Sequence, residues 1–406
     1  MIQLHKISYN KYDLMVMILI ICQINGLYFG ILNPISFFVL LFFPNLLKNL
    51  QGDTIRLVKP FRYFFAFWML YNLCSLLWVP LFWRSLYYCL LFLIDFILFL
   101  EIIVFSKRAS IPHDSIATGW ILAFLMTSFV AIWELQTGNH LSIAKEHLSR
   151  ENTMIDNAIG NYTSVTFYNI NTYAIYILEV IPFVFYTIVS KTSLIKKILA
   201  YYCGLMAIIF IFIDGSRGAS LSLLLMFLVF LYLMWKVNKK NVVWIILTLG
   251  IIIYLLYAYI EIILAIVTYR METVGFEDDS RQVLYEKSLE LIFNSGGIGT
   301  GVGSMVPAME AQGNYYDMYY SHNLFLEFLM QFGLLLFVGF LYYLFKLYTM
   351  ARRRELTRKV VLYSALFGLP FYSIINSEYT YHHFVWCYFA VLFVYASPKY
   401  EKIILV

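Results

Sequence analysis

Among the arginines and histidines of this sequence, we single out Arg217, Arg281 and His322. Arginine is a residue type that binds phosphate, and histidine is one that accepts protons. A guanidinium group is planar and can hold a phosphate through two parallel hydrogen bonds. An imidazole is the side chain best suited to accept a proton near neutral pH. These residue types predict binding of a phosphate-bearing substrate next to a proton-accepting group.

Arg217 stands in a tight turn between two apolar stretches, where residues 214–219 read DGSRGA. The next stretch begins near Gly218, so the arginine lies at a helix N-terminus, whose free N–H groups and partial positive charge suit an anion. A phosphate clamp at Arg217 is one interpretation. The alternative is an arginine that extends to the membrane interface and pairs with Asp214, and spacing alone does not separate the two.

Arg281 opens the segment 281–293, whose apolar residues recur at helical spacing after an acidic run. Asp279 or Ser280 would cap a short interfacial helix here and leave Arg281 in its first turn. A cation at that place opposes the helix dipole, so helix stability does not explain it. The alternative is a salt bridge with the neighbouring acids, which is worth little when exposed.

His322 begins the sequence HNLFLE, at the start of a long apolar stretch, with Asn323 and Glu327 close by. Ionisable groups in or near a membrane span are costly to bury and favour a functional interpretation. The alternative for His322 is a hydrogen-bonded interfacial histidine. Four tyrosines, at 315, 316, 319 and 320, precede it; they predict either a groove for sugar rings or an aromatic belt at the membrane interface.

The glycine-rich residues 296–304 read GGIGTGVGS, which does not indicate a nucleotide loop. No strand precedes them and no GK[ST] follows. We expect a flexible or closely packed backbone at the membrane surface instead. The five cysteines lie in apolar stretches without metal-binding spacing, so they indicate neither a disulfide framework nor a metal site. We expect no cofactor.

The elements that must position these residues are membrane-spanning helices. The 406 residues are 62% hydrophobic and 13% charged, which excludes a soluble protein. Apolar runs of about 20 residues cross a bilayer as helices, and the alternation of a β-barrel is absent. We predict an all-α polytopic protein, residues 1–406 forming a single transmembrane domain with about twelve spans: 14–30, 31–47, 63–82, 85–106, 115–134, 172–190, 196–213, 218–235, 242–267, 323–347, 360–377 and 382–396.

The distribution of cations predicts the orientation of these spans. With the N-terminus in the cytoplasm, 22 of the 29 lysines and arginines fall inside, so the positive-inside rule predicts that both termini are cytoplasmic. Two long connections, 135–171 and 268–322, then lie outside, and long loops commonly carry function. The outer face keeps seven cations: Arg84, Lys145, Arg150, Arg217, Arg270, Arg281 and Lys287.

The order of these pieces resembles the O-antigen ligase and O-antigen polymerase superfamily of bacterial membrane proteins. The SRGA turn at 216–219 precedes a large outer loop with an early arginine, a glycine-rich stretch, and HNLFLE ahead of FGL at 332–334. Upstream, WELQTG at 133–138 and NINTYA at 169–174 are similar to further stretches of that family. The resemblance covers residues 130–345, and it departs at 294–297, which read NSGG where the family often has Pro-Leu-Gly-x-Gly.

The resemblance implies glycosyl transfer on the outer side of the bacterial plasma membrane, from an oligosaccharide on undecaprenyl pyrophosphate, without a metal or a nucleotide sugar. In family terms Arg217 and Arg281 hold the pyrophosphate and His322 activates the acceptor hydroxyl. The residues then expected to bind substrate are Asn323, Glu327, Tyr319, Tyr320, Asn171 and Glu134.

The leading hypothesis is a polymerase that joins lipid-linked repeat units into a capsule, exopolysaccharide or O-antigen. Its partners would be the undecaprenyl-pyrophosphate-linked oligosaccharide, the growing polysaccharide acceptor, membrane lipid, and flippase and chain-length regulator proteins, and no nucleic acid. One alternative is a ligase that moves a finished glycan to another acceptor. Others are a flippase or transporter of the lipid-linked sugar, for which two related halves are typical, and a structural membrane scaffold.

Overall fold

The computed structural model describes residues 8–24, 33–50, 62–141, 162–167, 169–237, 250, 278–313 and 320–400. Within these ranges every regular element is helical, so the predicted all-α class is confirmed for the described part of the chain. The predicted span 242–267 and much of the two long connections lie outside these ranges, as does Tyr319.

Six helices are long and apolar enough to cross a membrane: α4 (Phe82–Arg108), α5 (Pro112–Thr137), α7 (Ile170–Val189), α8 (Leu194–Ile213), α9 (Arg217–Val237) and α14 (Leu324–Ala351). Shorter helices are α1 (Lys11–Cys22), α2 (Pro34–Asn49), α3 (Arg62–Ser75), α12 (Asp278–Asn294), α13 (Met305–Ala311), α15 (Leu356–Tyr372) and α16 (His383–Ala396). Two short 3₁₀ helices, η2 (Tyr379–Tyr381) and η3 (Pro398–Tyr400), complete the described elements. These helices support a polytopic membrane protein, while the number of twelve spans stays a prediction.

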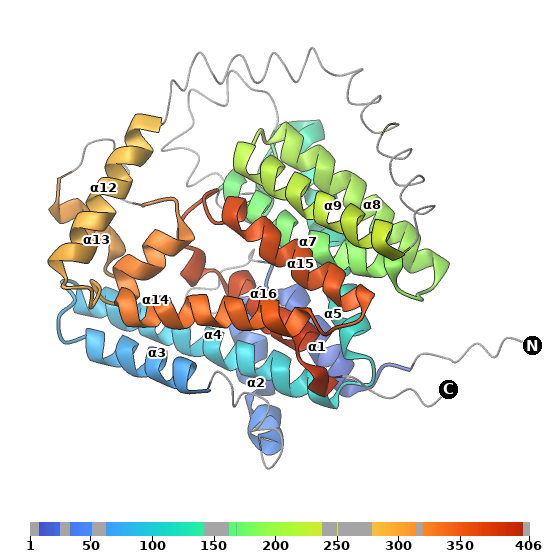
Figure 1. Cartoon of the computed structure of the whole chain (residues 1–406), viewed down its shortest axis with the longest axis horizontal. Coiled ribbons are helices and arrows are strands. Elements are labelled where there is room, and N and C mark those ends of the chain that lie inside the picture. The colour runs from blue at the N-terminus through green and yellow to red at the C-terminus, as the bar shows by residue number, and fades with distance from the viewer. Residues whose placement is uncertain are drawn as a thin grey trace, which may run out of the picture.

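The helices pack in two connected groups (Figure 1). In one group α7 contacts α8, α9 and α15. In the other, α4 packs on α1, α2 and α16, while α14 contacts α3, α12, α15 and α16. Nearly the whole length of α7 is buried, and a helix that is apolar on most sides belongs inside a bundle.

Three of the cations predicted to lie inside, Lys107, Lys196 and Arg358, lie at one end of the bundle. Lys196 pairs with Asp114 at 2.6 Å, and Lys107 donates to the carbonyl oxygen of Lys399. Arg358 is fully buried and donates to the carbonyl oxygen of Tyr395 at 2.7 Å. Arg358 lies in the first turn of α15, and residues 373–375, described below, follow the other end of that helix.

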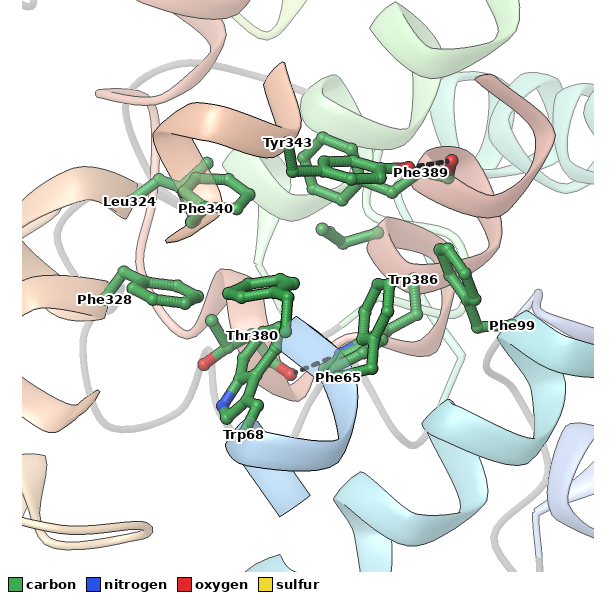
Figure 2. A pocket seen from close by; sticks show the side chains of 12 residues that line it. Phe65, Trp68, Phe99, Leu324, Phe328, Phe340, Tyr343, Thr380, Trp386 and Phe389 are labelled. Carbon is green, nitrogen blue, oxygen red and sulfur yellow. Dashed lines mark hydrogen bonds between the residues drawn. The ribbon is translucent and has the colours of Figure 1, made fainter. Parts of the chain in front are cut away.

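A small cavity lies among aromatic rings of α3, α14 and α16 (Figure 2). Trp68 and Trp386 stack with ring centroids 4.8 Å apart, and the Trp386 indole N–H donates to the carbonyl oxygen of Thr380 at 2.9 Å. The cavity measures about 30 Å³, which is far too small for a sugar ring. We interpret this aromatic cluster as the packed core beneath the start of α14.

Candidate functional site

The start of α14 holds His322 in an uncommon backbone conformation. The Asn323 side chain caps the helix and accepts from the N–H groups of Phe325 and Leu326 at 3.0 and 3.2 Å. His322, just before the cap, has φ of 48°, in the left-handed region that few non-glycine residues adopt. Asn323 therefore positions His322 by fixing where the helix begins.

The chain that follows α15 lies against Arg281 and against the start of α14, two residues after His322. The N–H of Leu324 donates to the carbonyl oxygen of Ser373 at 2.8 Å. Arg281, in the first turn of α12, donates from Nη1 to the carbonyl oxygen of Ile374 at 3.4 Å. Helix α12 begins at Asp278, earlier than the predicted 281, so neither Asp279 nor Ser280 is its N-cap residue, although Arg281 stays in the first turn.

The start of α9, the helix that begins with Arg217, packs against the same segment. Arg217 is exposed and is the first residue of α9, and the next residue, Gly218, packs so closely that an added Cβ would lie 3.0 Å from Cγ1 of Ile375. The backbone of residues 373–375 therefore meets the start of α9, the first turn of α12 and the start of α14. We call these three residues the 373–375 segment.

The charge of Arg281 influences His322. Burial, the larger effect, and the nearby Arg281 guanidinium together lower the pKa of His322 from 6.5 to about 4, because both disfavour the protonated ring. The Nδ1 atom of His322 is buried and finds no hydrogen-bond partner among the described residues. At pH 7 this imidazole is neutral, which is the form that can accept a proton.

Two acidic residues hold the described part of the first long connection. Glu134 is fully buried and accepts from the N–H groups of Ser164 and Val165, both at 2.9 Å, while Nδ1 of His140 lies 3.0 Å from it. Asp214 accepts from the N–H and the hydroxyl of Thr163 at 2.9 and 2.6 Å. Because protein donors occupy its oxygens, we predict that Glu134 positions this loop and does not contact the substrate.

Asn171 lies in the first turn of α7, and its N–H donates to the Asn169 side chain at 2.7 Å. The next residue, Thr172, accepts at its hydroxyl from the Asn376 amide at 2.6 Å. This contact brings the start of α7 beside the 373–375 segment.

Glu327 is fully buried in the first turn of α14. The backbone of Glu378 and Tyr379 lies near its carboxylate, but neither carboxylate oxygen has a hydrogen-bond partner among the described residues. The expected role of Glu327 in substrate binding stays a prediction. Tyr320 is half-buried near the turn before η2.

The glycine-rich residues pack tightly against a break in α14. Gly333 has φ of 76° and ψ of 176°, and a Cβ there would lie 2.1 Å from the carbonyl oxygen of Ile298. Thr300 donates its N–H to Met330, and Leu334 donates to Gly297, both at 2.8 Å. The closely packed interpretation of this stretch is thus confirmed.

Sequence reasoning missed residues 373–379. They follow an apolar helix and carry no motif, and the one local signal is Glu378, an acidic residue within a long apolar region. His383, which had no evident partner in the sequence, lies in the core with Nδ1 2.5 Å from Asp95 and Nε2 2.8 Å from the Asn33 amide. Among the described residues, no three His, Cys, Asp or Glu side chains are grouped to hold a metal ion.

Comparison with known proteins points the same way as this geometry. Residues 202–341 match the family described as O-antigen ligase, a range that includes Arg217, Arg281 and His322. The chain is also 25% identical over 366 residues to the teichuronic acid biosynthesis protein TuaE of Bacillus subtilis (strain 168), an alignment that covers 82% of this chain and 71% of TuaE. Residues 202–341 are therefore an O-antigen ligase family domain, in a chain that is a distant homologue of TuaE.

Proposed function

We propose that this protein is a metal-independent membrane glycosyltransferase that joins oligosaccharide repeat units, carried on undecaprenyl pyrophosphate, into a surface polysaccharide. One observation carries the proposal: the 373–375 segment contacts the beginnings of three helices that bear Arg217, Arg281 and His322. Two guanidinium groups and a neutral imidazole carried by these three elements would suit transfer from a diphosphate.

The two arginines would act on the leaving group. When the bond between the anomeric carbon and the pyrophosphate oxygen breaks, negative charge gathers on the pyrophosphate. Guanidinium groups already in place stabilise that charge in the transition state without rearranging. Arg281 is tied to the Ile374 carbonyl, whereas Arg217 is exposed at the start of α9 and is available to a lipid-linked substrate.

His322 would act on the acceptor. The acceptor hydroxyl loses its proton to the imidazole as its oxygen bonds to the anomeric carbon, and the lipid pyrophosphate departs from the opposite face. This is an inverting displacement with His322 as general base. The lowered pKa of His322 keeps the ring neutral before the reaction.

The site would face the outside of the bacterial plasma membrane, with both termini in the cytoplasm. Two features support this orientation: the excess of cations in the opposite connections, and the gathering of Lys107, Lys196 and Arg358 at the other end of the bundle.

Reconstitution of the full chain in liposomes tests the proposal, with an undecaprenyl-pyrophosphate-linked oligosaccharide as substrate and a chelator present. We expect a ladder of products, and we expect Arg217→Ala, Arg281→Ala and His322→Ala to abolish it at equal protein level. A ladder that requires a divalent metal, or that persists in all three variants, would refute the assignment.

A ligase is the second candidate, because the matching family carries that description. It would transfer one glycan to a separate acceptor and form a single product, not a ladder. A flippase would form no new glycosidic bond, and its loss would leave lipid-linked units on the inner face of the membrane.

A further inference from the structure

A second group of polar side chains lies beside the proposed transfer site, and of its members only Tyr320 was expected from the sequence to bind substrate. Glu378 stands just before η2, and the hydroxyl of Tyr320 lies within hydrogen-bonding reach of its carboxylate. Tyr88, on α4, interacts electrostatically with the charge of Glu378 and accepts a hydrogen bond from Arg84. All four side chains are half-buried, so they are partly open to a ligand. We call these four residues the Glu378 cluster.

The cluster offers both aromatic faces and polar groups. The rings of Tyr88 and Tyr381 pack with centroids 4.2 Å apart, and the Arg84 guanidinium lies 5.8 Å from the centre of the Tyr88 ring. Nε of Arg84 is buried and has no hydrogen-bond partner among the described residues. Rings, a carboxylate and a donor without a partner together form a set that can contact a sugar on its C–H face and at its hydroxyl groups.

The backbone at Glu378 is held in an unfavourable conformation. Its φ is 61°, in the left-handed region that glycine adopts without steric cost and that strains other residues. Strained residues persist where the surrounding structure fixes them, and they concentrate at functional sites. A glycine would fit this turn better, so the side chain of Glu378 is the feature that needs an explanation.

The turn that carries Glu378 is joined to the proposed transfer site. The hydroxyl of Tyr379 accepts from the N–H groups of Ile375 and Asn376 at 3.1 and 3.0 Å. Tyr379 also feels the charge of Arg281. Glu378 therefore lies only a few residues after the 373–375 segment. The other residues of its cluster are Tyr320 and two residues of α4, Arg84 and Tyr88, and none of them is on α9, the helix of Arg217.

We propose that the Glu378 cluster is the subsite that binds the terminal sugar of the acceptor and presents its hydroxyl to His322. This inference rests on the proposed glycosyl transfer and names the second substrate's place in it. The expected ligand is a pyranose ring with free hydroxyl groups. Glu378 and Tyr320 would hold those hydroxyls, Tyr88 would lie against the ring, and Arg84 would supply further donors.

Kinetics on the reconstituted full chain test this assignment. The donor is an undecaprenyl-pyrophosphate-linked oligosaccharide, and the acceptor is the free repeat-unit oligosaccharide, released from the same lipid pyrophosphate by mild acid. Glu378→Gln and Tyr320→Phe should each raise the KM for the acceptor by about tenfold, the loss expected for a hydrogen bond to a charged group. The KM for the donor should stay unchanged.

Two matched controls carry the same chemical changes outside the cluster. Glu310→Gln alters an exposed carboxylate on α13, and Tyr87→Phe alters the exposed tyrosine next to Tyr88. Both should leave the acceptor KM as in the wild type. Glu378→Gly removes the carboxylate but relieves the strained φ, so it should fold at least as well as the wild type and still raise the acceptor KM.

Binding without turnover provides an independent readout. Saturation-transfer NMR detects binding of the free oligosaccharide. We expect a signal with the wild type and with Arg217→Ala, and we expect no signal with Glu378→Gly. An unchanged acceptor KM in both Glu378 variants, with Arg217→Ala inactive, would overturn the subsite and leave the proposed function standing. A wild-type protein that makes no glycosidic bond would overturn both.

Discussion

Arg281 on α12 donates a hydrogen bond from Nη1 to the backbone carbonyl oxygen of Ile374, with 3.4 Å between the two atoms. The neighbouring carbonyl, that of Ser373, accepts from Leu324 at the start of α14. One short stretch of backbone therefore sets the distance between the arginine and His322. In the proposed reaction, the charge of Arg281 would in this way act on both the leaving group and the imidazole.

We expect Arg281→Ala to lower the kcat for transfer by about 100- to 1,000-fold, the usual effect of removing one group that stabilises transition-state charge. Arg281→Lys should lose less, because it keeps the charge but not the planar fork. Steady-state rates at saturating donor measure both. Gln282→Ala, an exposed neighbour on α12, is the control. Equal rates for the alanine variant and the wild type would remove Arg281 from the site.

The pH dependence should report His322. Because burial and Arg281 lower the pKa of His322 to about 4, the neutral base is present from pH 7 down to about 5 and is lost as the pH falls through 4. We expect kcat/KM to stay level over the first interval and then to decline. In Arg281→Gln the repulsion is gone, so the decline should move to higher pH while burial still keeps it below 6.5. A wild-type decline centred near 6.5 would contradict this.

Gly333 should tolerate no side chain. Its φ of 76° is unfavourable for alanine, and the added Cβ would meet the carbonyl oxygen of Ile298 at 2.1 Å. We expect Gly333→Ala to lower the free energy of unfolding by about 1–3 kcal/mol or more, read as a lower melting temperature in detergent. Gly204→Ala on α8 has its nearest atom, Cγ1 of Val184, at 3.4 Å and should melt no lower than the wild type.

Glu134 should stabilise a loop without binding substrate. In Glu134→Ala the N–H groups of Ser164 and Val165 lose their acceptor, at a cost of about 1–3 kcal/mol for each group left unpaired. Hydrogen exchange at these two amides should become faster, whereas it should not change in Gln136→Ala, an exposed neighbour on α5. A raised donor KM with unchanged exchange would instead assign Glu134 to substrate contact.

The sequence alone determined the helices and the residue types. Eleven of the twelve apolar runs contain a helix in the described part of the chain, because hydrophobic length and composition are local properties of a segment. The turn before α9, the short helix around Arg281 and the start of α14 were likewise readable from neighbouring residues. Even there the boundaries moved, since α12 begins at Asp278.

Only the tertiary structure decided which of these residues meet. Residues 373–375 carry backbone acceptors and no motif, so their contacts with Arg281, Leu324 and Gly218 could not be read from side-chain types. Glu378 comes close to Tyr320 and Tyr88 only because α4, α14 and η2 pack together. Packing joins positions far apart in the chain through shape and hydrogen-bond geometry, and no local pattern encodes which partner a given surface will find.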